Sequence, residues 1–312
     1  PVARVVADVE RAGTPLRVEV ALRALTPRPG PSHGEAVGVE KRFKVDGLPQ
    51  TASQVVGQVR AVLFSTSDVE LVGGAPALRR RFLDIALCQL DRHYLRHLQR
   101  YQRVLAQRNH LLRRIAQGLA RTQELAFWDE ELATHRSAIT SERGRFLAEL
   151  QEAAWPLHTT LTGESNALDL AYAPALPAAC EATTEGLAER FRLALKEALP
   201  REIEIGSTQI GPHRDDFLIS LAGVNAGVYG SRGQRRTIAL ALRLAEVCLQ
   251  TAHAGEPPLI LLDDVFSELD PRRRGQVMEA ISGYQQVILT TTDLGLVSPE
   301  LLEQACVCRV EG

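Results

Sequence analysis

The sequence predicts an α/β fold in which an all-helical arm is inserted into the middle of a sheet-containing head. Three observations predict it. β-rich runs occur near both ends of the 312-residue chain, and long helical stretches separate them. Residues 259–262 (LILL) form a continuous apolar run, which is typical of a buried parallel strand. We therefore expect residues 1–75 and 201–312 to build the head and residues 76–200 to build the arm.

The composition is that of a globular protein. Hydrophobic residues make up 45% of the chain and charged residues 24%, which excludes a disordered or collagen-like chain. No apolar stretch approaches the roughly 18 residues that a membrane helix needs. The 36 Lys and Arg against 38 Asp and Glu give a net charge of −2, an average that hides any local charged patch. No signal peptide is visible, so the expected compartment is the cytoplasm.

The first 75 residues predict strands. Two β-rich runs flank a Gly- and Pro-containing turn, so residues 2–24 are expected to form a hairpin. Residues 26–34 (TPRPGPSHG) predict a loop without core-forming side chains. Residues 41–46 alternate polar and apolar side chains, and residues 60–64 (RAVLF) predict a short buried strand.

Between residues 76 and 200 the apolar pattern is helical. Helices are predicted over residues 91–118, 127–155 and 185–199. Pro156 is expected to end the second of them, because proline lacks the N–H that continues a helix. A loop-rich stretch is expected after it.

Strands return after Pro200. We expect them at residues 202–205, 217–221, 259–262 and 286–290. Helices are predicted between and after them, over residues 234–253, over residues 271–282 and near Glu300.

The apolar run at 259–262 ends in two acids, Asp263 and Asp264. Acids at the carboxyl end of a buried parallel strand form the Walker B pattern. The first acid can hold Mg²⁺ through water, and the second can polarise an attacking water for phosphoryl transfer. The alternative is a buried strand with a polar exit into a turn.

The residues after the two acids strengthen this interpretation. Ser267-Glu268-Leu269-Asp270 follows two residues later, and Pro271 then opens a helix. In ABC-type ATPases such a segment is the D-loop, which lies across a dimer interface. Asp270 is also a good helix N-cap, and the two roles are compatible.

Upstream lies a small-residue turn at the start of an amphipathic helix, Ser231-Arg232-Gly233-Gln234. Backbone N–H groups and the helix dipole make such a turn a natural phosphate site. In ABC-type ATPases this is the signature motif, which meets the γ-phosphate held by the other subunit. Asp293 ends the last strand where transporter ATPases place a His, and a helix N-cap there is an equally good interpretation.

Three further segments carry a family resemblance. They are Gly211–Asp216 (GPHRDD), Phe64–Val72 (FSTSDVELV) and Arg79–Asp84 (RRRFLD). With the Walker B and signature segments, in this order, they resemble the RecF family of bacterial recombinational-repair ATPases over essentially the whole chain. The family usually has FSPEDL in the second segment, and Thr66 and Ser67 depart from its PE.

The resemblance implies a P-loop NTPase-like, ABC-type ATPase head with ATP and Mg²⁺ as cofactors. It implies a homodimer that forms with ATP, binds single-stranded, gapped or junction DNA, and hydrolyses ATP slowly. It also implies work with RecO and RecR in loading RecA during recombinational repair and the SOS response. Ser231 to Gln234, Asp270 and Asp293 would lie at the nucleotide, Asp263 at Mg²⁺, and Asp264 would be catalytic.

One family motif is missing from the 312 residues. RecF-like proteins carry a GxxxxGK[ST] P-loop near the amino terminus, and Lys41, Lys44 and Lys196 all lie outside any such pattern. The chain begins at Pro1 and runs directly into a strand-like segment. We therefore expect it to lack an upstream strand–P-loop–helix unit, and we do not expect the 312 residues alone to bind ATP tightly or to be active.

The helical arm carries a concentration of arginine. Residues 79–121 contain eleven Arg and only two acids. Arg92, Arg96, Arg100 and Arg103 are spaced three or four apart, so they form a stripe on one helix face. Such a stripe suits sequence-independent contact with DNA phosphates. A solvated face that pairs with acidic neighbours is the alternative.

Two other classes of function stay open on the sequence. One is the ATPase subunit of a membrane transporter, against which the helical arm and Asp293 in place of His argue. The other is a nucleotide-independent DNA-binding scaffold, which would follow if the P-loop were absent in nature. Dependence of DNA binding on ATP in the full-length product would separate them.

Overall fold

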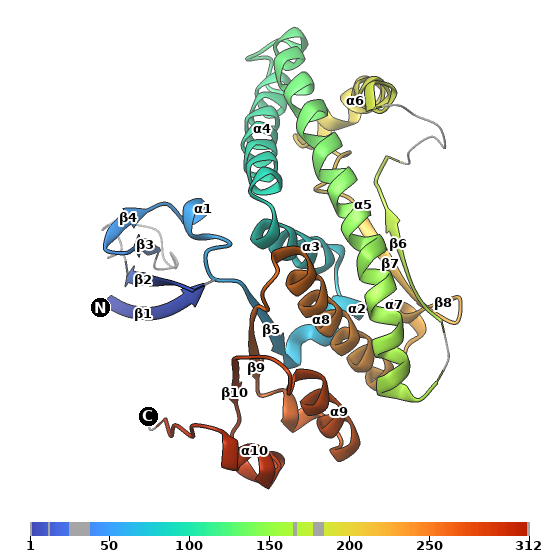
Figure 1. Ribbon diagram of the computed structural model, residues 1–312. Coiled ribbons are helices and arrows are strands. Elements are labelled where there is room, and N and C mark those ends of the chain that lie inside the picture. The colour runs from blue at the N-terminus through green and yellow to red at the C-terminus, as the bar shows by residue number, and fades with distance from the viewer. Residues whose placement is uncertain (1, 12, 25–37, 165–166, 177–183, 311–312) are drawn as a thin grey trace, which may run out of the picture. The chain divides into compact units, whose positions relative to one another are not determined.

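The computed structural model describes residues 2–11, 13–24, 38–164, 167–176 and 184–310 (Figure 1). The chain forms two compact units, Pro1–Arg60 and Ala61–Gly312. The loop predicted at residues 26–34 lies outside the described residues. The predicted boundaries at 75 and 200 stay predictions. Among the described helices, none is both long enough and apolar enough to cross a membrane.

The first unit is an antiparallel sheet with its strands in chain order. The strands are β1 (Val2–Arg11), β2 (Thr14–Ala24), β3 (Val39–Val45) and β4 (Leu48–Gln50). β1 and β2 pair from Val2 with Arg23 to Arg11 with Thr14, which confirms the predicted hairpin. A short helix, α1 (Ala52–Val55), follows β4.

The second unit contains a parallel sheet in the order β10-β9-β5. Its strands are β5 (Ala61–Ser65), β9 (Leu259–Asp263) and β10 (Val287–Thr290). Side chains of one sheet face, such as Val62 and Ile260, share a buried core with helices α8 (Arg232–Ala254) and α9 (Pro271–Ile281). The register pairs Ser65 with Asp263 and Asp263 with Thr290, so the three carboxyl ends lie at one level.

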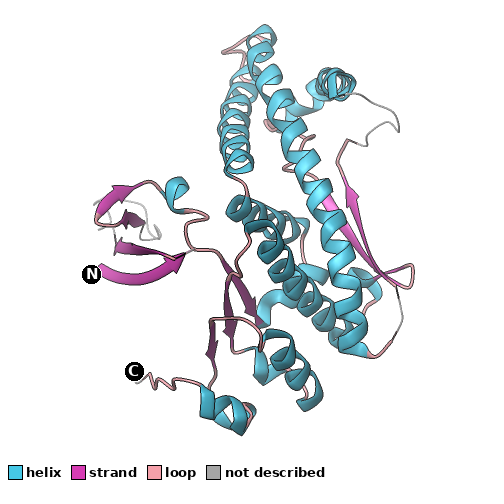
Figure 2. Ribbon diagram, viewed as in Figure 1, coloured by secondary structure: helices cyan, strands magenta, loops and turns pink. Residues whose placement is uncertain are grey.

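The second unit also holds the helical arm, which Figure 2 shows as long helices beside a small sheet. The arm is built on α3 (Pro76–Leu90), α4 (Arg92–Ala116), α5 (Ala126–Thr162) and α6 (Thr184–Ile205). α5 extends from the arm along α8, and both contribute to one continuous core. The small antiparallel sheet consists of β6 (Leu168–Ala173), β7 (Asp216–Leu221) and β8 (Val224–Asn225).

Short helices connect these elements. They are η1 (Thr66–Asp68), α2 (Val69–Gly73), η2 (Thr122–Leu125), α7 (Ala226–Tyr229), η3 (Val265–Glu268), η4 (Leu294–Leu296) and α10 (Pro299–Gln304).

Two helix ends differ from the prediction. α5 continues past Pro156 to Thr162, because the lost hydrogen bond is offset by core packing of Leu157 and Leu161. α6 likewise continues through Pro200, so residues 202–205 are helical and the predicted strand there is wrong. Buried Glu202 and its bond to Arg108 hold this last turn against α4.

β6 was not predicted, because a loop-rich stretch was expected between the helices. Its residues pair antiparallel with β7, from Leu168 with Leu221 to Ala173 with Asp216. The alternating burial of Leu168 and Leu170 is that of a strand with one covered face. The run is only six residues long, and prolines follow it closely.

Candidate nucleotide and DNA sites

The two Walker B acids lie at the carboxyl edge of the parallel sheet. Asp263 is the last residue of β9, and its Oδ1 accepts a hydrogen bond of 2.8 Å from Thr290 Oγ1 on the neighbouring strand β10. The backbone N–H of Asp264 donates to Thr290 Oγ1 and to the Thr290 carbonyl oxygen, both at 3.2 Å. Thr290 therefore fixes both acids at the edge where ligands bind in open α/β sheets.

Asp264 has an unusual backbone and an unpaired oxygen. Its φ is +50°, in the left-handed region that non-glycine residues rarely adopt. Ser267 Oγ donates to the Asp264 carbonyl oxygen at 2.8 Å and to Oδ2 at 3.1 Å. The buried Oδ1 has no hydrogen-bond partner among the described residues. Burying a carboxylate oxygen without a hydrogen-bond partner is destabilising. Asp264 Oδ1 is therefore suited to accept a hydrogen bond from a water molecule or a ligand that binds at this edge.

The donor set at this edge fits a hydrated Mg²⁺. Magnesium in nucleotide sites is commonly held by one or two carboxylates, several waters and the phosphates themselves. Asp263, exposed at the strand end, and the unpaired Asp264 oxygen supply that kind of ligand. Within the described ranges, no three His, Cys, Asp or Glu side chains cluster to form an all-protein metal site.

The signature turn is closed by a capping box. Ser231 is the N-cap of α8, where its Oγ accepts from Gln234 N at 3.2 Å and its own N–H donates to Gln234 Oε1 at 2.9 Å. Ser231 and Gln234, both predicted to contact phosphate, therefore also stabilise the start of the helix. Arg232 lies at the first helical position with its side chain 77% exposed, and Gly233 follows it.

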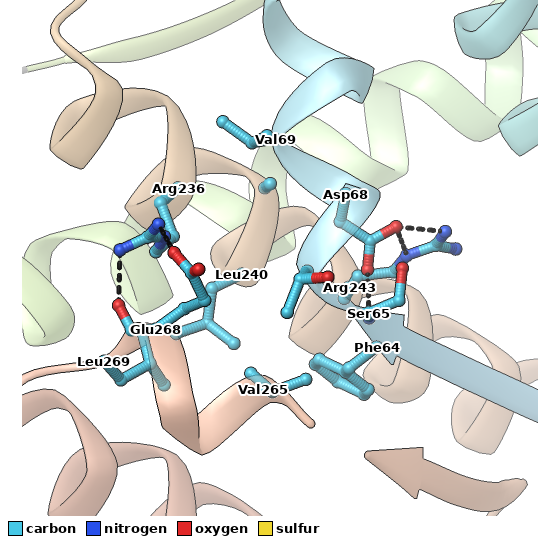
Figure 3. Close-up of a pocket in the computed structure, with 12 residues that line it drawn as sticks. Phe64, Ser65, Asp68, Val69, Arg236, Leu240, Arg243, Val265, Glu268 and Leu269 are labelled. Carbon is cyan, nitrogen blue, oxygen red and sulfur yellow. Dashed lines mark hydrogen bonds and ion pairs between the residues drawn. The ribbon is translucent and has the colours of Figure 1, made fainter. Parts of the chain in front are cut away.

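Glu268, in the segment after the Walker B strand, contacts α8, the helix that begins at the signature turn. Arg236 donates to both the carbonyl and the carboxylate of Glu268, and the Arg232 guanidinium lies 3.9 Å from the same carboxylate. Arg236 and Glu268 border a pocket that Ser65 and Asp68 line from the other side (Figure 3). The sequence motifs on α8 and η3 are therefore adjacent in space.

An ion pair on one side of this pocket was not predicted. Arg243 of α8 donates to Asp68 Oδ1 at 2.7 Å and to buried Glu246 at 2.8 Å. It also stacks over the ring of Phe82, 5.1 Å from the ring centroid. Asp68 and Arg243 lie 175 residues apart, so no spacing rule could pair them. The pair fixes α8 to η1, the short helix that directly follows β5.

Asp270 and Asp293 both cap helices. Asp270 Oδ1 accepts from Arg273 N at 3.0 Å at the start of α9, and this backbone hydrogen bond lowers the pKa of the carboxyl. Asp293 Oδ1 accepts from Gly295 N at 2.8 Å at the end of the β10 edge. The N-cap interpretation is confirmed for both, and their contact with nucleotide stays a prediction.

The arginine stripe lies on the solvent side of α4. Arg92, Arg96 and Arg103 are exposed, and none of them is paired with a carboxylate in the part of the chain that the structure describes. Arg100 is different, because its guanidinium binds Glu131 of α5 at 3.0 Å. The inner face of α4 buries one arginine of the basic segment, Arg108. Three of the four predicted residues are therefore available to an anionic partner.

The fold and this site together define the class of protein: an ABC-type ATPase head with an inserted helical arm. No family model matches the chain. Curated relatives do, each called DNA replication and repair protein RecF: the one from Chloroflexus aurantiacus is 44% identical, over 100% of this chain and 80% of its own length. The one from Roseiflexus castenholzii is 39% identical over the same shares. The chain belongs to the RecF family of DNA replication and repair proteins.

Solved structures agree with this assignment. A structure described as the recombination mediator protein RecF with ATPrS, in the RecFOR pathway, superposes with a TM-score of 0.78. It is 29% identical, and the match covers 90% of this chain and 72% of the other. A second, described as RecF with ATP, also has a TM-score of 0.78, over 89% and 71%.

Proposed function

We propose that this protein binds ATP with Mg²⁺ between two copies of itself and binds DNA in the ATP-bound dimer. The observation that carries the proposal is the unpaired, buried Oδ1 of Asp264 at the strand edge, next to Asp263. The similar solved structures are described as RecF with ATP or ATPrS, which supports the nucleotide. A site shared by two copies has the symmetry of an ordinary two-fold dimer.

Each group at the edge has a chemical role in slow ATP hydrolysis. Asp263, oriented by Thr290, would hold Mg²⁺, which supplies charge neutralisation at the phosphate oxygens. Asp264 would accept the hydrogen bond of the attacking water through its free oxygen and orient it. The exposed turn from Ser231 to Gln234 of the second copy would present backbone N–H groups and Arg232 to the γ-phosphate.

The test of the nucleotide site is Asp264→Asn in the full-length gene product. We expect ATP binding and ATP-dependent dimerisation to persist while hydrolysis falls by at least about a hundredfold, the usual range for loss of a general base. Calorimetry, light scattering and phosphate release measure the three properties. Asp169→Asn, at an exposed position of β6, is the matched control and should keep wild-type hydrolysis. Wild-type turnover in Asp264→Asn would remove Asp264 from this role.

DNA would contact the stripe on α4 through its phosphates. Arg92, Arg96 and Arg103 are free of carboxylate partners among the described residues, and phosphate contact releases counterions from the nucleic acid. Replacing all three by Gln should weaken single-stranded DNA binding and reduce the slope of log affinity against log salt by about 2, at roughly 0.7 per phosphate. Arg145→Gln, on an exposed arginine of α5 already paired with Glu142, should change neither quantity. An unchanged slope in the triple variant would contradict the assignment.

The biological role we propose follows the family. The protein would recognise single-stranded, gapped or junction DNA and act with RecR and RecO to load RecA in recombinational repair and the SOS response. That work takes place on chromosomal DNA, in the cytoplasm. Reconstitution of RecA loading on gapped DNA, with and without the full-length product, tests this role. No gain in RecA loading would contradict it.

A further inference from the structure

The GPHRDD segment, Gly211–Asp216, has no role in the proposed nucleotide or DNA sites. It runs from the loop after α6 to the first residue of β7 and contacts α3, α4, α5 and β6. Arg143 of α5 donates to Pro212 O at 2.7 Å. Arg79 of α3 binds the Asp216 carboxylate with two hydrogen bonds of 2.7 and 2.9 Å. Each of these is an interaction with a charged donor, so the segment is held firmly.

The remaining carboxylate of the segment binds the β6 side. Asp215, 2% exposed, accepts from Tyr172 Oη at 2.6 Å and from Ala175 N at 2.8 Å. Arg80 donates to the Asp215 carbonyl oxygen at 2.8 Å. The carboxylates of Asp215 and Asp216 are therefore bound by the side chains of Tyr172 and Arg79, respectively, and so hold the segment in place.

Both ring nitrogens of His213 form hydrogen bonds. Its Nε2 lies 3.0 Å from Thr208 O, which can only accept, so Nε2 carries the proton. Its Nδ1 lies 2.7 Å from Tyr101 Oη of α4 and accepts from it. Burial lowers the pKa of the ring to about 4, so the ring is neutral at pH 7. No ring nitrogen is left to contact a nucleotide or to transfer a proton.

Tyr101 lies on the opposite face of α4 from the arginine stripe. Tyr101 is 1% exposed, whereas Arg96 and Arg103 point to solvent. Gly211 packs directly on the tyrosine, with φ of +129° and no room for a Cβ beside Tyr101 Oη. Movement of α4 would therefore be transmitted to the segment through close contacts, since packed interiors do not deform continuously.

The other end of the segment leads to the signature turn. Arg79, held by Asp216, also donates to Gly74 O at 2.9 Å at the end of α2. α7 packs on α2 so closely that a Cβ on Gly227 would lie 2.7 Å from Val72 O. α7 ends at Tyr229, two residues before Ser231 (Figure 1). A continuous set of packed, hydrogen-bonded groups thus connects α4 with the signature turn.

We propose that Tyr101 and His213 are positioning residues that couple DNA contact on α4 to the position of the signature turn. The inference rests on the proposed function, because it needs both an ATP site and a DNA site. It gives the GPHRDD segment a mechanical role: DNA on the outer face of α4 and ATP at Ser231 would each favour the same position of the segment. Coupling of this kind is reciprocal between the two ligands.

The test is Tyr101→Phe in the full-length product, which keeps the ring and removes one hydrogen bond. The quantity measured is the ratio of DNA affinities with ATPγS and with ADP. We expect this ratio to fall about fivefold, the factor that one neutral hydrogen bond supplies. DNA affinity with ADP, and ATPγS affinity without DNA, should stay within about twofold of wild type, which a general loss of structure would not allow.

Tyr94→Phe is the control. Tyr94 lies on the same buried face of α4; its hydroxyl donates to Asp84 and accepts from Arg143, and it makes no hydrogen bond to the GPHRDD segment itself. It should keep the wild-type ratio, and an equal loss in both variants would overturn the coupling role. His213→Leu, which removes both ring hydrogen bonds, should lower the ratio as Tyr101→Phe does.

The outcomes separate the inference from the function on which it rests. If wild-type DNA affinity does not depend on the nucleotide, the proposed function fails. If the wild type responds and Tyr101→Phe responds equally, the inference fails and the proposed function stands.

Discussion

His213 should make the stability of the arm depend on pH in a defined direction. Burial lowers the pKa of its ring from 6.5 to about 4. The unfolded chain therefore binds a proton between these pH values that the folded chain does not. The contribution of His213 to stability is fully present above pH 6.5 and is lost as the pH falls toward 4.

The magnitude follows from the two pKa values. Linkage between a pKa of 6.5 in the unfolded chain and about 4 in the folded one gives a loss of about 2 kcal/mol between pH 7 and pH 5. Other groups also titrate in this range, so the effect is isolated by comparison with His213→Leu, which cannot titrate. The difference in unfolding free energy between wild type and this variant should shrink by about 2 kcal/mol from pH 7 to pH 5.

Denaturation followed by tryptophan fluorescence measures this difference. Both tryptophans of the chain, Trp128 and Trp155, lie on α5, so the signal reports the arm-bearing unit. His110→Leu, at an exposed position of α4, is the control variant measured at the same pH values. A constant difference for His213→Leu across pH 7 to 5 would refute the assignment of His213 as a buried neutral ring.

Two further predictions concern stability in the same unit. Gly211→Ala should destabilise it by roughly 3 kcal/mol, because its φ of +129° is strained for alanine and the added Cβ would clash with Tyr101. Gly144→Ala, in open space on α5, should have the opposite sign and stabilise by up to about 1 kcal/mol; equal effects would contradict the packing. Glu202→Gln should lower the free energy of unfolding, measured by urea denaturation, by roughly 3 kcal/mol, because it leaves the buried charge of Arg108 without its closest carboxylate. Unchanged stability would mean that this pair contributes nothing.

Local patterns in the sequence were sufficient for the identity of the motifs and for the elements that carry them. The apolar run before Asp263, the capping pattern from Ser231 to Gln234 and the periodicity of α4 each depend on residues within one or two turns or strands. These signals are short-range, so a single sequence contains them completely. The RecF resemblance, carried by the same motifs in order, is confirmed by relatives that match the whole chain.

Local patterns failed where long-range packing outweighed a local rule. Pro156 and Pro200 each remove one backbone hydrogen bond. After Pro156 this loss is offset by core packing of Leu157 and Leu161. After Pro200 it is offset by the contact of Glu202 with Arg108 of α4 together with packing of Ile203, so both helices continue. The partners of these helix ends lie far away in the sequence, so the residues around each proline do not predict that the helix continues.

The sequence by itself determined the fold class, the family and the candidate nucleotide residues of this protein. Only the tertiary structure decided how those residues are connected. It paired Asp68 with Arg243 over 175 residues and Tyr101 with His213 over 112, and it left one oxygen of Asp264 without a partner. Spacing along the chain cannot predict such pairs, because they depend on the direction and burial of side chains from distant elements.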